Sequence, residues 1–127
     1  MSKIKIHKKR ASMLEEILVK LFTEIDQIEQ TNKTTCVITK TDKNGLFSVE
    51  EGRIVLPIEF SRISVLIGNH LLVQKGNKFG IFSIQTLSLV LPVECEKIIY
   101  ADSGLYEVTK NGKKEIFNIR TNELITP

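Results

Sequence analysis

A 35-residue internal repeat constrains this chain more than any other feature of its sequence. Two sets of residues recur at intervals of 35 positions: Pro57, Pro92 and Pro127, and Phe47, Phe82 and Phe117. Aligned without gaps, residues 37–71 and 72–106 share ten identities, where ordinary residue frequencies give about two. A partial third copy covers residues 107–127. Short repeats bury their apolar faces against one another, so we predict an array of about 2.6 copies within the 127 residues.

Within each copy, the order of apolar and polar residues predicts a β-hairpin. In the first copy Phe47 and Val49 flank Ser48, which is the alternation of a half-buried strand. A short turn leads to an apolar run at residues 54–56. We expect Pro57 to end this strand, because proline has no backbone N–H to donate to a neighbour. The spacing after the proline predicts one helical or 3₁₀ turn, followed by a third strand.

Residues 12–30 have a different period, which predicts an amphipathic helix. Ser12 and Glu15 have the spacing of a capping box, and apolar residues recur every three or four positions from Leu14 to Ile28. We expect this helix either to cover the open end of the array or to pair with a second chain, giving a monomer or a homodimer through the helix. The expected core is Phe47, Val49, Val55, Phe82, Ile84, Val90, Phe117 and Ile119, with Leu18, Leu21 and Ile25 from the helix.

The expected fold class is therefore mainly β with one N-terminal amphipathic helix (α+β). A basic arm, residues 1–11, precedes a single domain, residues 12–127, which holds the helix and the repeats 37–71, 72–106 and 107–127. A chain of this length buries enough surface for one core.

The repeat also resembles a known family. The residues that carry the resemblance are Lys43-Asn44-Gly45-Leu46-Phe47 with Val55-Leu56-Pro57, and Lys78-Phe79-Gly80-Ile81-Phe82 with Val90-Leu91-Pro92. This pattern is similar to the WG-repeat family of bacterial β-hairpin repeats. The family's tryptophan is replaced by Asn44, Phe79 and Lys114, and its glycine becomes Glu115 in the third copy. The resemblance implies a β-rich interaction or structural module, with no catalytic residues to carry over. We expect a bacterial or phage source.

Charge is concentrated at the N-terminus of the chain. The formal net charge is +3, and residues 1–10 alone carry +5. The cations of this arm are Lys3, Lys5, Lys8, Lys9 and Arg10. They are candidate contacts for a partner protein or for phosphate groups, which makes a nucleic-acid-associated protein the alternative function. The arm has no aromatic residue for base stacking, and no nucleic-acid-binding motif accompanies it.

Residue types that carry catalysis or bind metals are few and scattered. Cys36 and Cys95 lack the spacing of a disulfide framework or a thiolate metal site, and His7 and His70 have no ligand partner nearby in sequence. We predict no enzyme activity, no metal and no cofactor. No apolar run is long enough to span a membrane, so we predict a cytoplasmic location. The function expected is a non-catalytic protein–protein interaction module: a small adaptor, or an inhibitor that blocks another protein such as a nucleic-acid-processing enzyme.

Overall fold

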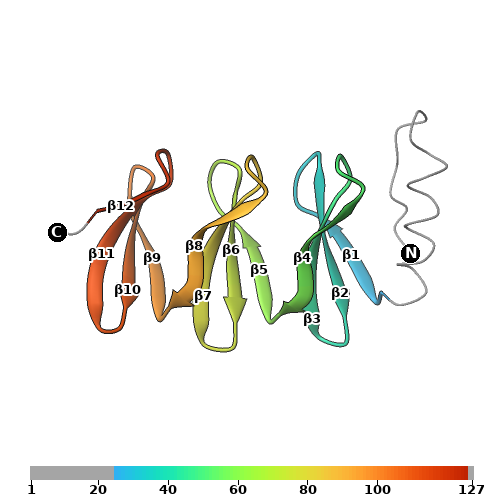
Figure 1. The fold of residues 1–127 in the computed structure, drawn as a ribbon, viewed down its shortest axis with the longest axis horizontal. Coiled ribbons are helices and arrows are strands. Elements are labelled where there is room, and N and C mark those ends of the chain that lie inside the picture. The colour runs from blue at the N-terminus through green and yellow to red at the C-terminus, as the bar shows by residue number, and fades with distance from the viewer. Residues whose placement is uncertain (1–24, 126–127) are drawn as a thin grey trace. The chain divides into compact units, whose positions relative to one another are not determined.

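The computed structural model describes residues 25–125, which form twelve β-strands (Figure 1). They make three antiparallel sheets of four strands each. The first sheet contains β1 (Gln27–Gln30), β2 (Thr35–Lys40), β3 (Lys43–Ser48) and β4 (Arg53–Phe60). The second contains β5 (Arg62–Val65), β6 (His70–Lys75), β7 (Lys78–Ser83) and β8 (Ser88–Cys95). The third contains β9 (Lys97–Asp102), β10 (Leu105–Lys110), β11 (Lys113–Asn118) and β12 (Glu123–Ile125).

The expected fold class is wrong in two respects. Residues 25–125 are all β, and the last residues assigned to the helix form strand β1 instead. Residues 25 and 26 of the expected helix are not helical either, and its residues 12–24 lie outside the described residues. The repeat also supplies three four-stranded sheets rather than about 2.6 three-stranded units. Each sheet begins ten residues before the boundary expected at positions 37, 72 and 107. The chain divides into two compact units, residues 1–59 and 60–127.

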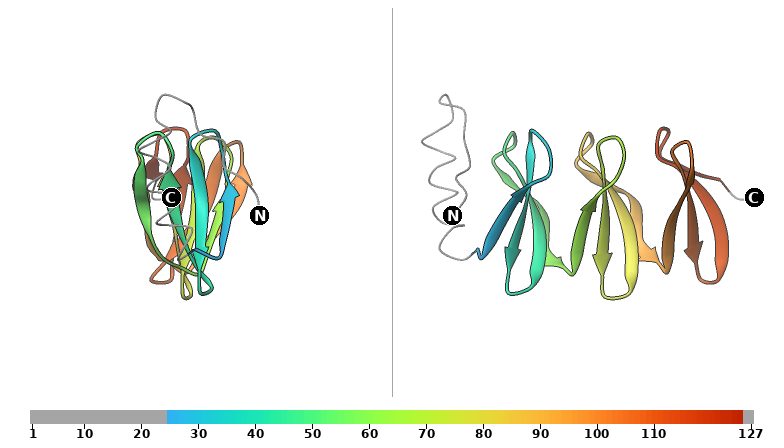
Figure 2. Two further views of the ribbon diagram at one scale, coloured as in Figure 1. Left: turned by 90° about the vertical axis from the view of Figure 1, so that its right-hand side faces the viewer. Right: turned by 180° about the vertical axis from the view of Figure 1, so that it is seen from behind.

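The 35-residue period itself is confirmed by the structure. Phe47, Phe82 and Phe117 occupy the same position of the third strand in their sheets, and each is only 1% exposed. The third strands pair with the second strands in the same register, so that these phenylalanines face Cys36, Leu71 and Tyr106 respectively. The view from behind in Figure 2 shows the twist of each sheet.

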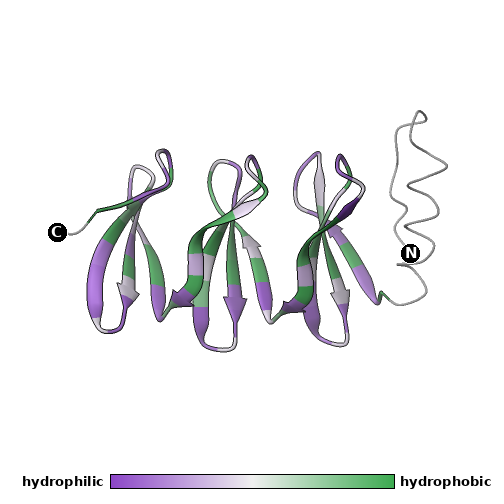
Figure 3. Ribbon diagram, viewed as in Figure 1, coloured by the Kyte–Doolittle hydropathy of each residue, from purple (hydrophilic) through white to green (hydrophobic). Residues whose placement is uncertain are grey.

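A two-residue turn joins the second and third strands of every sheet. Lysines flank each turn and pair across it, as Lys75 does with Lys78 and Lys110 with Lys113. Asn111 and Gly112 both have positive φ, 53° and 77°, which is the pattern of a type I′ turn. These segments are therefore tight turns of β-hairpins. The hairpin tips are polar in all three sheets (Figure 3).

Proline does not end the fourth strand, contrary to the expectation. Strand β8 continues through Pro92 to Cys95. Along β7 the pairing moves from Ile81 to Phe79 while along β8 it moves from Leu91 to Cys95, so the extra residues of β8 form a bulge around the proline. A bulge tolerates the missing N–H. The expected helical turn after the proline is absent from both described copies, where strands β5 and β9 follow almost at once.

Within residues 60–127 the core lies between the second and third sheets. Its buried members are Ile81, Leu91, Cys95, Tyr106, Val108, Phe117 and Ile119. Ile81 and Phe82 are adjacent in β7 and both fully buried, so this strand is covered on its two faces. The expectation of half-buried strands was therefore wrong for the middle of the sheet. Of the expected core residues, Phe47, Phe82, Phe117 and Ile119 are buried, whereas Ile25, Val49, Val55, Ile84 and Val90 are partly exposed. Leu18 and Leu21 lie outside the described residues.

Candidate functional site

All five cations predicted as partner or phosphate contacts, Lys3, Lys5, Lys8, Lys9 and Arg10, lie outside the described residues. Residues 25–125 themselves contain twelve acidic and twelve basic side chains, so their formal net charge is zero. Any site in this part of the chain must therefore be built from local features rather than from overall charge.

Both cysteines are buried. Cys36 is 3% and Cys95 is 1% exposed, and burial raises the pKa of each thiol. A buried neutral thiol is a poor nucleophile. Among the described residues no group of three or more His, Cys, Asp or Glu side chains is placed to hold a metal ion. No helix in the same range is long and apolar enough to cross a membrane.

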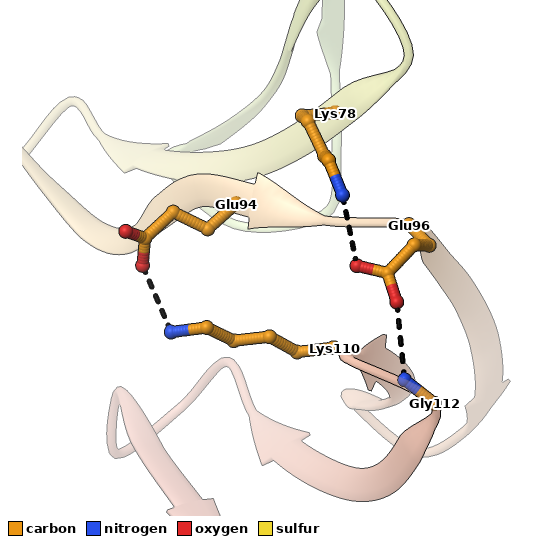
Figure 4. Close-up of polar contacts among 5 residues, drawn as sticks. All are labelled: Lys78, Glu94, Glu96, Lys110 and Gly112. Atoms are coloured by element: carbon orange, nitrogen blue, oxygen red, sulfur yellow. Dashed lines mark hydrogen bonds and ion pairs between the residues drawn. The ribbon is translucent and has the colours of Figure 1, made fainter.

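A charged cluster joins the second sheet to the third (Figure 4). Glu96, between β8 and β9, accepts a hydrogen bond from Lys78 Nζ at 3.2 Å through one carboxylate oxygen and from the backbone N–H of Gly112 at 3.2 Å through the other. These contacts lower the pKa of Glu96, the Gly112 N–H being the largest cause. The carboxylate thus holds the tip of the β10–β11 hairpin against β7.

A second ion pair in the cluster crosses between the same two sheets. Lys110 Nζ lies 2.8 Å from Glu94 Oε1, and this contact raises the pKa of Lys110. The partner of Glu94 is thus a lysine of the next repeat. All four charged groups of the cluster are paired, so its chemistry is that of a structural clasp between sheets.

The other candidate is the exposed edge of the third sheet. Among the strands of residues 25–125, β9 is terminal in its sheet and has β10 as its one partner. Its middle section, residues 98–101, contains no charged side chain, and Ile99 and Tyr100 are each 53% exposed. We call residues 98–101 the β9 edge. Large apolar side chains on a strand with one open edge are a feature that proteins usually avoid unless something binds there.

The aromatic side chain of the β9 edge is held in place by a ring on the neighbouring strand β10. The ring of Tyr100 meets the ring of Tyr106 edge-on, with centroids 5.4 Å apart. Burial raises the pKa of Tyr106, and a backbone hydrogen bond from Ile67 acts in the opposite direction. Tyr106 thereby links Tyr100 to the second sheet, and Ile67 is itself 49% exposed.

The remaining edges of residues 60–127 are less suited to pairing. Strand β8 carries Pro92 and a bulge, β12 has three residues, and β5 has four, compared with six in β9. Prolines and bulges protect sheet edges from adding further strands. The sequence did contain a signal for the β9 edge, the uncharged run Ile98-Ile99-Tyr100-Ala101, but periodicity alone assigned Ile98 to a turn.

Comparison with known proteins adds no family assignment, because no family model and no curated protein matches this chain. The resemblance to WG repeats therefore stays a prediction from the sequence.

Proposed function

We propose that this chain is a non-catalytic protein-binding module whose contact surface includes the β9 edge. The observation that carries the proposal is the combination of a free strand edge with two half-exposed apolar side chains, Ile99 and Tyr100. An extended segment can add to such an edge through main-chain hydrogen bonds, while alternate side chains select the partner. Tyrosine is also among the residue types enriched in interfaces.

The surroundings of the β9 edge favour protein recognition over chemistry. Lys97 and Asp102 flank it with one charge of each sign, so the edge has neither the dense positive charge that a nucleic acid needs nor a cluster of catalytic groups. A small adaptor or an inhibitor acts by covering a surface, which requires only such an edge. Free buried cysteines suit a cytoplasmic setting for this function.

The test compares capture of proteins from a host extract by the full chain and by two variants. Ile99→Lys places a charge at the centre of the β9 edge and should abolish capture of a specific partner. Leu89→Lys is the matched control, because Leu89 is 42% exposed and lies on β8, an edge strand of the second sheet. Capture of the partner by this variant should persist. Equal capture by both variants would refute the role of the β9 edge.

Nuclease treatment and a third variant distinguish protein binding from the alternative function, which is nucleic-acid contact. A partner that survives nuclease supports protein binding. Material that is lost with nuclease, and also lost when Lys8, Lys9 and Arg10 are changed to serine, would instead assign the function to nucleic-acid contact by the basic arm.

A further inference from the structure

We infer that the β9 edge pairs with the β9 edge of a second copy of this chain, so that two third sheets join into one continuous sheet. The inference rests on the proposed function, because it takes the β9 edge as a protein contact, and it names the partner. It follows from three properties of the strand: the direction of its backbone groups, the placement of its two charges, and a bulge.

The first property is which residues offer backbone groups to the open edge. In antiparallel pairs, residues alternate between those that exchange hydrogen bonds with the partner and those that do not. In the second sheet the backbone N–H of Leu66 donates to His70 O at 2.9 Å. This pair lies two residues along from Ser64 and Leu72 in the same register. Both pairs therefore belong to the class that exchanges backbone hydrogen bonds. The repeat position of Ser64 in the third sheet is Ile99. Ile99 therefore bonds to β10, and Ile98 and Tyr100 turn their N–H and C=O groups outward.

The second property is the order of charges along β9. The strand reads Lys97, four uncharged residues, then Asp102. An antiparallel partner that complements it needs a basic residue at its N-terminal end, an acidic residue at its C-terminal end and uncharged residues between them. Strand β9 has this order itself, so it is its own complement.

The third property is a bulge that places the two charges on one face. The register of β9 with β10 shifts beside Tyr106, so that Asp102 pairs with Leu105. Leu105 shares a face with Glu107, the partner of Ile99. Asp102 therefore lies on the face of Lys97 and Ile99.

These three properties fix one register for a two-fold pair. Ile98 of each copy exchanges backbone hydrogen bonds with Tyr100 of the other, and the two Ile99 residues face each other at the centre. Lys97 then lies opposite Ala101 of the second copy and beside its Asp102. A two-fold axis perpendicular to the sheet satisfies both halves equally, as an isologous interface requires.

The test is sedimentation of the full chain over a range of concentrations, combined with a charge swap. The wild type should dimerise. Lys97→Glu and Asp102→Lys alone should each raise the dimer dissociation constant about tenfold, and the double variant should restore it. The two residues are about 16 Å apart along a single strand, so rescue requires a contact between chains. A monomer at every concentration, or failure of the double variant to restore the dimer, would overturn the inference.

A cross-link tests the register independently. Residues facing each other in a non-bonded antiparallel pair have Cα atoms about 4.5 Å apart, within the range of a disulfide. Ile99→Cys should therefore form a dimer under oxidation, and the control Leu89→Cys should not. Absence of the Ile99→Cys cross-link would exclude this register.

The two proposals can fail separately. If the chain is monomeric but Ile99→Lys still loses a captured protein, the second copy is excluded and the binding function stands. If the chain dimerises with the expected charge rescue but captures no other protein through the β9 edge, the dimer is supported and binding of a different protein at this edge is refuted.

Discussion

At the scale of single residues, Gly80 is required because another backbone crosses it. A Cβ built on Gly80 would lie 2.6 Å from Leu91 O and 2.8 Å from Val93 N. Both contacts are with the bulged part of β8, which cannot move without breaking its pairing. Gly45 of the first sheet has the same environment, with Leu56 O at 2.7 Å. The recurrence of glycine in these two copies therefore reflects close packing and not a turn.

We expect Gly80→Ala to lower the free energy of unfolding by about 2–3 kcal/mol, because the added methyl group overpacks the crossing. Chemical denaturation of the full chain measures this loss. Gly76→Ala is the control: Gly76 has φ +61° but no atom within 4 Å of an added Cβ, so it should cost only about 1 kcal/mol. Equal losses for the two variants would show that the crossing is not tight.

Leu87 has a left-handed backbone conformation that is less favourable for leucine than for the residues at this position in the other two repeats. It has φ 52°, and the residues at the same position are Gly52, with φ 67°, and Asn122, with φ 58°. The turn therefore keeps a left-handed backbone in all three sheets, whichever residue stands there. Asparagine tolerates the left-handed region better than leucine. We expect Leu87→Asn to raise stability by about 0.5 kcal/mol and Gly52→Leu to lower it, both measured by thermal unfolding. A lower midpoint for Leu87→Asn would mean that packing of the leucine outweighs its strain.

At the scale of elements, the sequence predicted the period and the hairpins, and missed the first strand of each sheet. The missed strands are short and mostly exposed at one edge: β5 has the pattern exposed, intermediate, intermediate, exposed, so it has no clear alternation. In the first copy the apolar residues with helical spacing extend to Ile28, which lies in β1. The spacing within this segment therefore predicted a helix where the structure has a strand. Comparing the copies would have corrected this, because Ile28, Ile63 and Ile98 are also 35 apart.

The continuation of the fourth strand could not be read from proline chemistry alone. The rule that proline ends a ladder has an exception at bulges, and the bulge depends on a glycine in the neighbouring strand. The paired recurrence of Gly45 with Pro57 and of Gly80 with Pro92 was visible, but its meaning is a long-range contact. The clasp at Glu96 was equally hidden, because its partners lie 18 and 16 residues away on either side.

The clasp makes stability depend on pH in a defined direction. The pKa of Glu96 is lowered in the folded protein, first by the Gly112 N–H and also by Lys78. Its contribution is therefore present above the ordinary carboxylate pKa of 4.5 and is lost as pH falls through the lowered value. We expect Glu96→Gln to reduce the thermal midpoint at pH 7. The difference in thermal midpoint between the variant and the wild type should become smaller as the solution is acidified. Glu123→Gln, on exposed β12, should follow the wild type; a gap for Glu96→Gln that is constant with pH would contradict the assignment.

At the scale of the whole molecule, sheets of the same design are not interchangeable. The face of the third sheet that points away from the second bears Glu107 and Lys114, whose charged groups are 3.6 Å apart. The second sheet has Leu72 and Phe79 at these positions. Repeat arrays need a polar surface wherever a sheet faces solvent. The third sheet is therefore suited to carry an open face.

Because the second and third sheets share one core, they should lose stability together. Phe117 packs in the cluster that also contains Ile81 and Cys95 of the second sheet, so Phe117→Ala should cost about 3–5 kcal/mol. Hydrogen exchange should then accelerate in β7 and β8 as well as in β10 and β11, since in repeat proteins neighbouring units stabilise each other through their interface. Ile125→Ala, at a side chain 50% exposed on β12, provides the control and should leave exchange in β7 nearly unchanged. Acceleration confined to the third sheet would show that the two sheets fold independently and that the clasp and the shared core couple them only weakly.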